Sequence, residues 1–286
     1  MKKLILCLPC LLLIFLLHGH SKTFKINPSS YDHRTFNRTH EQLDIFLQQL
    51  AIKNKYSEDG WTLIWQEEFH EDLLDTKTWN IEDWASEKNN ELQYYTPKNI
   101  SITANQLQLI SNKEDYKGRS YTSAAIHTKD KFYFRYGKVE MRAKLPSGQG
   151  IFPAFWMMPN IDNTWLPEID ILEMLGDKPY EIWMVQHWLD NNQQLVSRSS
   201  SYQGPNYAEN FHTYSLEWAP DSLKWFIDGE LRFQTKHSSP DMDMYLYVNT
   251  AIGGDWPGNP DETTSFQQVF EIDYMRVYQQ KGDGQK

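Results

Sequence analysis

The segment 168–173, Glu-Ile-Asp-Ile-Leu-Glu, places three carboxylates within six residues. Its isoleucines favour a β-strand, in which Glu168 and Asp170 would share one face while Glu173 points to the other. A β-bulge at residues 171–172 would add one residue and turn Glu173 to the same face. Two carboxyl groups about 5–5.5 Å apart suit a retaining glycosidase, with one as nucleophile and the other as acid/base. The alternative is a charged edge strand whose acids are only solvated.

Apolar stretches of strand length surround this segment from Trp61 onward. They recur roughly every 8–12 residues with few helical patterns between them, which is typical of a β-sandwich. Asp228-Gly229, between two such stretches, is a hairpin-turn signal. The 286-residue chain is long enough for one large core. We therefore predict an all-β catalytic domain over residues 59–280.

The N-terminal residues 1–21 have the pattern of a secretory signal peptide: two lysines, an apolar run and small residues at a cleavage site. Both cysteines, Cys7 and Cys10, lie inside this segment, so the mature chain would hold no disulfide or thiolate site. We expect a secreted protein, extracellular or periplasmic, with no membrane association after cleavage. A lipid on Cys10 or an uncleaved anchor is the alternative.

Residues 22–58 are polar and form a predicted spacer. Within them Leu43, Phe46, Leu47 and Leu50 follow the i, i+3, i+4, i+7 spacing of a short amphipathic helix. Nothing in this segment indicates catalysis.

The net charge of −10 argues against a nucleic-acid partner. Aromatic residues make up 14% of the chain, including 11 tryptophans. Most would pack in a large β-core, but several stand beside Gly, Pro and acidic residues, as expected of a cleft that stacks sugar rings.

Seven separate segments carry a resemblance that spans residues 60–279. They are 65–69 (WQEEF), 89–93 (NNELQ), 137–146 (GKVEMRAKLP), 153–159 (PAFWMMP), 168–174 (EIDILEM), 253–256 (GGDW) and 272–278 (IDYMRVY). In this order they resemble glycoside hydrolase family 16, specifically the laminarinase-like endo-β-1,3-glucanases. The resemblance implies a jelly-roll β-sandwich of two antiparallel sheets with an open substrate cleft across the concave face.

The resemblance also implies roles for the three acids. Glu168 matches the nucleophile, which attacks the anomeric carbon, and Glu173 matches the acid/base. Asp170 would hydrogen-bond Glu168 and help to separate the two glutamate charges. Neighbouring negative charge raises the pKa of a carboxyl group, which is the direction that the acid requires.

Six further positions are candidate substrate contacts. His187 matches a family histidine near the acid/base, with a core or surface histidine as the alternative. Asn90 and Arg142 match positions that hydrogen-bond sugar hydroxyls, although Arg142 would equally suit an outer face paired with Glu140. Three tryptophans would stack on sugars or, alternatively, pack in the core: Trp156, Trp165 and Trp256.

The reaction needs no cofactor, but family resemblance implies a structural calcium ion on the convex side. Glu68 and Asp273 match its acidic ligands, and hard oxygen ligands suit calcium. Asn105 replaces the family's glycine at the third position. Asparagine tolerates left-handed backbone geometry better than most residues.

We therefore expect a monomeric, secreted, retaining endo-hydrolase of internal β-1,3 bonds in β-glucans such as laminarin. Two departures bear on the substrate: only Leu166 and Pro167 separate Trp165 from Glu168, and Ala124-Ala125 stands where relatives commonly have an arginine second. Another β-linked polysaccharide (mixed-linkage glucan, galactan or agarose) is one alternative. A non-catalytic β-glucan-binding module is the other.

Overall fold

The computed structural model describes residues 47, 60–236 and 238–280. The chain divides into two units, Met1–Ile52 and Lys53–Lys286, and every described residue except Leu47 belongs to the second. The predicted signal peptide lies outside the described residues. So does the predicted amphipathic helix apart from Leu47, which is helical and exposed. Across the described residues, no helix combines the length and apolar character needed to cross a membrane.

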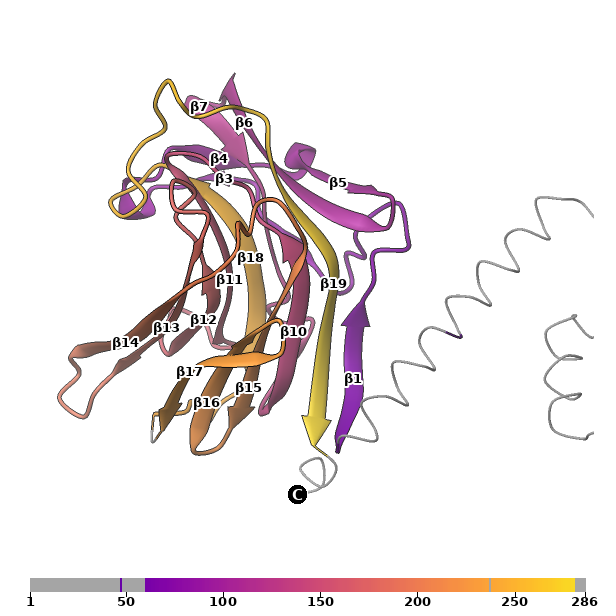
Figure 1. Ribbon diagram of the computed structural model, residues 1–286, viewed down its shortest axis with the longest axis vertical. Helices are drawn as coiled ribbons and strands as arrows, with labels where there is room; N and C mark the ends of the chain where they lie inside the picture. Colours follow the sequence, from indigo (N-terminus) through magenta and orange to yellow (C-terminus); the bar gives the residue numbers. More distant parts are fainter. Residues whose placement is uncertain (1–46, 48–59, 237, 281–286) are drawn as a thin grey trace, which may run out of the picture. The chain divides into compact units, whose positions relative to one another are not determined.

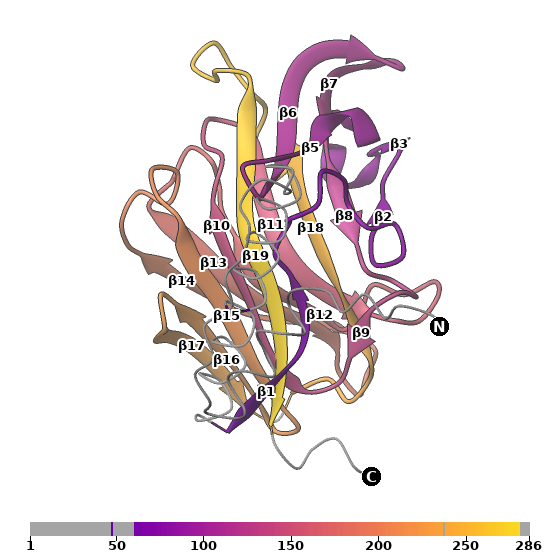
Figure 2. The same cartoon turned by 90° about the vertical axis from the view of Figure 1, so that its right-hand side faces the viewer.

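The second unit is a sandwich of two sheets (Figure 1). Neighbours in the eleven-stranded sheet are, in order, β17 (Glu230–Lys236), β16 (Ser222–Ile227), β15 (His212–Ala219), β10 (Gly137–Lys144), β19 (Gln268–Gln280), β6 (Gln106–Tyr116), β7 (Arg119–Ser123), β4 (Gln93–Tyr95) and β3 (Trp84–Ala85), with β1 (Trp61–Glu67) beside β19 and β5 (Ile100–Thr103) beside β6. The long strand β19 runs through the middle of this sheet (Figure 2).

The smaller sheet has eight strands. Their order is β14 (Leu195–Gln203), β13 (Glu181–Leu189), β12 (Glu168–Glu173), β11 (Ile151–Pro159), β18 (Met244–Ile252), β8 (Ala125–His127) and β2 (Asn80–Ile81), with β9 (Tyr133–Phe134) beside β18. Two short 3₁₀ helices, η2 (Lys88–Asn90) and η3 (Pro97–Asn99), complete the regular elements of the described residues. The predicted all-β jelly-roll sandwich is confirmed.

Alternation along the strands builds the core between the sheets. In β10, Val139 and Met141 point into the core, whereas Lys138 and Arg142 point outward. In β11, Phe155 enters the core while its neighbour Trp156 faces outward. Each sheet therefore has an apolar inner face that forms the core and an outer face whose side chains can contact a ligand.

The predicted hairpin turn at Asp228-Gly229 is confirmed between β16 and β17. Both residues have positive φ, 52° and 78°. This is the pattern of a type I′ turn, whose twist matches that of the flanking strands.

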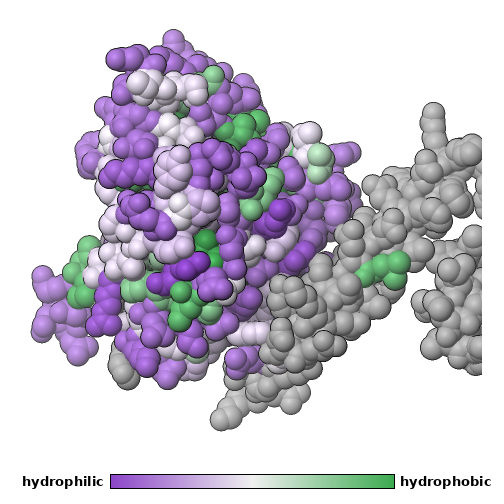
Figure 3. Space-filling view, in the orientation of Figure 1, coloured by the Kyte–Doolittle hydropathy of each residue, from purple (hydrophilic) through white to green (hydrophobic). Residues whose placement is uncertain are grey.

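A second, smaller apolar cluster lies on the outer face of the eight-stranded sheet. Trp84 and Tyr95, from β3 and β4, pack there against Tyr247 of β18 and Trp156 of β11. The end of the larger sheet therefore covers part of the smaller sheet's outer face. Elsewhere the molecular surface seen in Figure 3 is mostly hydrophilic, with small separate hydrophobic patches.

Candidate active site

The acidic segment forms β12 and contains the predicted bulge. On β11 the partners of Asp170 and Glu173 are Trp156 and Ala154, two residues apart, whereas the acids are three residues apart. The extra residue on β12 reverses the side-chain alternation within the strand. Ile169, Ile171 and Leu172 consequently enter the core, while Glu168, Asp170 and Glu173 share the outer face.

Burial dominates the electrostatics of these acids. It raises the pKa of Glu173 to about 8. Burial, with the nearby Glu173 charge, raises the pKa of Glu168 to about 8. Burial, with the charges of Glu168 and Glu173, raises the pKa of Asp170 well above its usual value. Lys88 of η2 acts in the opposite direction on the pKa of Glu168. Because the three carboxyl groups lie close together, ionisation of one disfavours ionisation of the others, and the raised pKa values favour retention of a carboxyl proton at neutral pH.

His187, on β13, lies directly opposite Glu168. Its Nε2 is 3.6 Å from Asp170 Oδ2 and 3.9 Å from Glu168 Oε1, and its Nδ1 is 2.6 Å from Ser197 Oγ. Burial lowers the pKa of His187, which favours the neutral imidazole. The structure therefore brings the predicted histidine to the acids, and Ser197 on β14 orients it.

Asp170 is held through its backbone by Trp225 and not by a side-chain hydrogen bond to Glu168. Its backbone carbonyl accepts a hydrogen bond of 2.9 Å from Trp225 Nε1. Its Oδ2 is buried and has no hydrogen-bond partner among the described residues. The structure records no hydrogen bond from Asp170 to Glu168 within the described part of the chain, and the position of His187 Nε2 makes the imidazole the nearest donor.

The predicted tryptophans occupy three different places. Trp165 is 44% exposed, and its ring lies 6.1 Å from that of His187. Trp256 is 45% exposed and makes an edge contact with Trp183 at 5.6 Å. Trp156 lies opposite Asp170, donates from Nε1 to Asn249 Oδ1 at 2.8 Å, and packs on Tyr247. Trp165 and Trp256 have the exposure that sugar stacking requires. Trp156 instead packs beside the acids and is held by its contacts with Asn249 and Tyr247.

Trp183 was missed by the sequence reasoning. It pairs with Glu173 across β12 and β13, and it shares the outer face with His187, four residues later. Its indole Nε1 is buried without a hydrogen-bond partner among the described residues. The spacing of four residues between Trp183 and His187 could have indicated that both lie on the same face of one strand.

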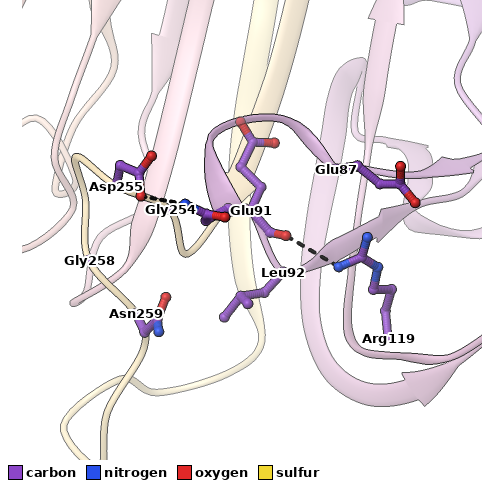
Figure 4. A pocket seen from close by; sticks show the side chains of 9 residues that line it. Glu87, Glu91, Leu92, Arg119, Gly254, Asp255, Gly258 and Asn259 are labelled. Atoms are coloured by element: carbon purple, nitrogen blue, oxygen red, sulfur yellow. Dashed lines mark hydrogen bonds between the residues drawn. The ribbon is translucent and has the colours of Figure 1, made fainter.

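Asn90 lines a cavity of about 690 Å³ between η2 and the loop after β18. Figure 4 shows other residues that line it, among them Glu91, Asp255 and Arg119. Its side chain donates to Asp255 Oδ1 at 2.7 Å. Arg119 closes the other side of the cavity by donating to the carbonyls of Glu91 and Ser86. Asn90 thus ties two loops together beside Trp256, and no direct contact between it and the three acids is recorded in the described residues.

Arg142 does not join the acids. It lies on β10 of the larger sheet, where alternation turns it to the outer face. Its guanidinium pairs with Asp273 at 2.5 Å and lies over the ring of Phe211. The interpretation of Arg142 as a sugar contact is therefore corrected, because the acids belong to the other sheet; its partner is Asp273 rather than Glu140.

The acids assigned to calcium are both engaged by arginines. Glu68 forms a two-point pair with Arg276, Oε1 to Nε at 2.7 Å and Oε2 to Nη2 at 2.9 Å. Asp273 pairs with Arg142. Asn105 has the left-handed φ of 58° expected at its position. Since Arg276 and Arg142 already neutralise the two carboxylates, these side chains do not fit a calcium site.

One other group has metal-ligand chemistry among the described residues. Potential ligand atoms of Glu168, Asp170 and His187 lie within 4.8 Å of one another. All three already belong to the acid cluster described above.

Comparison with known proteins agrees with this site. The family model described as glycosyl hydrolases family 16 matches residues 76–276. A β-glucanase of Rhodothermus marinus is 33% identical over 246 residues, covering 76% of this chain and 85% of that protein. Glucan endo-1,3-β-glucosidase A1 of Niallia circulans is 32% identical over 267 residues, covering 78% of this chain but only 38% of that longer protein. The laminarinase catalytic domain of Thermotoga maritima MSB8 has a TM-score of 0.72 at 36% identity, covering 78% of this chain and 99% of that chain. The chain therefore belongs to glycosyl hydrolase family 16 and is a glycoside hydrolase.

Proposed function

We propose that the protein is an endo-β-1,3-glucanase that cleaves laminarin-like β-glucans with retention of configuration. The observation that carries this proposal is the bulge in β12, which gathers Glu168, Asp170 and Glu173 on one face. The relatives that are named as laminarinases or β-1,3-glucanases support the choice of substrate.

The proposed reaction has two displacements. In the first, protonated Glu173 gives its proton to the leaving glycosidic oxygen while the Glu168 carboxylate attacks the anomeric carbon. In the second, the Glu173 carboxylate takes a proton from water, which attacks the glycosyl–Glu168 ester and releases the sugar. Burial keeps the proton on Glu173 before the first step.

His187 and Asp170 have positioning roles in this scheme. If the Ser197 hydroxyl donates to Nδ1, His187 presents its Nε2 proton to Asp170 and Glu168. At 3.6 Å and 3.9 Å these contacts are longer than hydrogen bonds, so the N–H acts on the carboxylates as a nearby dipole. In the proposed scheme His187 and the charge of Lys88 favour the ionised Glu168, while burial keeps the proton on Glu173.

A glucan-binding protein without catalysis would not need this arrangement. Burial raises the pKa of each of the three acids, so placing them together on one face lowers the stability of the fold. Perturbed carboxyl groups of this kind are typical of catalytic sites. The choice among β-1,3-glucan, mixed-linkage glucan, galactan and agarose is a finer part of the proposal, because loops around the sheet set the subsites.

We also propose that the protein is secreted, on the basis of the N-terminal pattern at residues 1–21. Mass spectrometry of the protein recovered from culture medium tests this. A mature N-terminus near residue 22 is expected, and a chain retained in the cell with Met1 intact would contradict secretion.

Release of reducing ends from laminarin, mixed-linkage glucan and agarose tests the substrate. The wild-type protein should cut laminarin best, and Glu168→Gln should be inactive on all three. Preference for another polymer would overturn the substrate assignment while leaving the mechanism. Binding of laminarin without cleavage would favour the glucan-binding alternative.

A further inference from the structure

A continuous row of outward-facing residues crosses the smaller sheet from the active site. Asp170 pairs with Trp156, Trp156 with Tyr247, and Tyr247 with His127. Neighbouring strands lie ~4.8 Å apart, so His127 is ~14 Å from Asp170 along this row. One strand spacing is similar to the advance of one hexose along a glycan, which places His127 about three sugar units from the acids.

Glu82 lies beside His127 at the far end of this row. It follows β2, and its backbone N–H donates to the carbonyl of Ala125 at 3.0 Å. Its carboxylate accepts hydrogen bonds from Trp84 Nε1 at 2.6 Å and from Tyr247 Oη at 3.1 Å. The side chain is 22% exposed, so it lies at the border between the cluster and solvent.

Glu82 faces the imidazole of His127. The backbone N–H of Lys129 donates to His127 Nδ1 at 3.2 Å, which leaves Nε2, 3.4 Å from Glu82 Oε1, as the ring's donor toward the carboxylate. The ring stacks on Tyr247 with an interplanar angle of 8°. No lysine or arginine pairs with Glu82 among the described residues. Burial raises the pKa of Glu82, but the hydrogen bond and electrostatic interaction with His127, together with hydrogen bonds from Tyr247 and Trp84, bring that pKa below its ordinary value.

Three features of this cluster suit a sugar ring: a fixed carboxylate, an indole edge and a packed aromatic floor. A carboxylate with spare acceptor capacity binds neighbouring hydroxyl groups, and it repels a sulfate or carboxylate. Ala125 is fully buried under this cluster, so its small side chain leaves the carboxylate of Glu82 as the charged group at this end of the row.

We propose that Glu82 and Trp84 form a distal subsite, about three sugar units from the catalytic acids, that accepts uncharged sugars and rejects anionic ones. This inference rests on the proposed function, because it describes how the same face selects its polysaccharide. The alternative is that Glu82 only holds Tyr247 in place.

The test compares kcat/KM on a short and a long β-1,3-gluco-oligosaccharide and on carboxymethylated β-1,3-glucan. In Glu82→Gln the ratio of long to short substrate should fall roughly tenfold, because hydrogen bonds to a charged acceptor are lost. The same variant should discriminate less between neutral and carboxymethylated glucan. Asp83→Asn is the matched control, since its carboxylate pairs with Lys117 at an exposed position, and it should leave both ratios unchanged.

Salt supplies a measurement that needs no variant. Raising the ionic strength should reduce the wild-type preference for neutral over carboxymethylated glucan, because screening weakens charge repulsion.

Unchanged ratios in Glu82→Gln, or a preference that does not respond to salt, would overturn the subsite. A lower melting temperature with both ratios unchanged would show the purely structural role. If the wild type cuts no β-1,3-oligosaccharide, the proposed function fails and this inference fails with it.

Discussion

His187 Nε2 lies 3.6 Å from Asp170 Oδ2, a buried oxygen without another hydrogen-bond partner in the described part of the chain. The two residues are on adjacent strands, and regular alternation in β12 places Asp170 on the same face as Glu168, which lies opposite His187. The bulge then brings Glu173 to this face, so that one histidine faces a cluster of three acids. The imidazole N–H faces this oxygen, while Lys88 is the cation that lowers the pKa of the neighbouring Glu168.

Removing the imidazole should therefore shift the pH dependence of catalysis. In His187→Ala the acidic limb of the kcat profile should move to higher pH, because the nucleophile loses a donor that stabilises its carboxylate. At neutral pH, kcat should fall by roughly ten- to a hundredfold. Ser197→Ala, which only frees the ring, should shift the limb in the same direction by less. A lower kcat with an unshifted profile would show that His187 acts only through packing.

The raised pKa values predict a pH-dependent free energy of unfolding. Glu168 and Glu173 have pKa values of about 8 in the folded protein, compared with 4.5 as the ordinary value. The folded state therefore binds more protons between these values, and stability should fall as the pH rises from about 4.5 to 8.

Glu173→Gln should remove part of this dependence. At pH 8 the variant should be more stable than the wild type by about 1–3 kcal/mol, and near pH 4.5 the difference should nearly vanish. Melting temperatures measured across this range provide the check. The exposed Glu230→Gln in β17 serves as the control. A wild type whose stability rises steadily over the same interval would contradict the electrostatic account.

Exposed tryptophans should contribute to substrate binding more than to folding. Trp165→Ala and Trp256→Ala should each lower kcat/KM on laminarin by roughly tenfold, since a large apolar contact with the sugar is lost. Their melting temperatures should change little. Leu231→Ala, at a position of similar exposure (48%) on the larger sheet, should affect neither quantity. Equal losses in all three variants would argue against a specific stacking role.

The Glu68–Arg276 pair predicts stability without calcium. Both side chains are mostly buried, at 15% and 11% exposure, and they meet at two points. Chelator should leave the melting temperature unchanged, whereas Glu68→Gln should cost about 3 kcal/mol because Arg276 would remain without its counter-charge. A melting temperature that falls with chelator and recovers with calcium would contradict this prediction.

Local pattern was enough to predict the strands and the bulge. The spacing of Glu168, Asp170 and Glu173 fixes which side of a strand each one takes, and the two apolar residues between the last two acids require the irregularity. The type I′ turn at Asp228-Gly229 is equally local. Such features depend on the alternation of a few neighbouring residues, which the sequence displays directly.

Contacts across the fold were harder to predict. The pairing of Arg142 with Asp273 depends on the register of β10 with β19, and no local pattern reveals that register. The cluster around Glu82 was missed because its partner Tyr247 is 165 residues away. Asn90 similarly bonds Asp255 across the same separation. Only the folded topology brings these pairs together.

The stereochemistry of the first product tests the central claim most directly. Proton NMR should follow the anomeric signals during the first minutes of hydrolysis of a β-1,3-gluco-oligosaccharide by the wild-type protein. The double displacement through Glu168 predicts that the β-anomer appears first and then equilibrates with the α-anomer. Initial release of the α-anomer would show a single displacement by water and would contradict the assignment of Glu168 as the nucleophile.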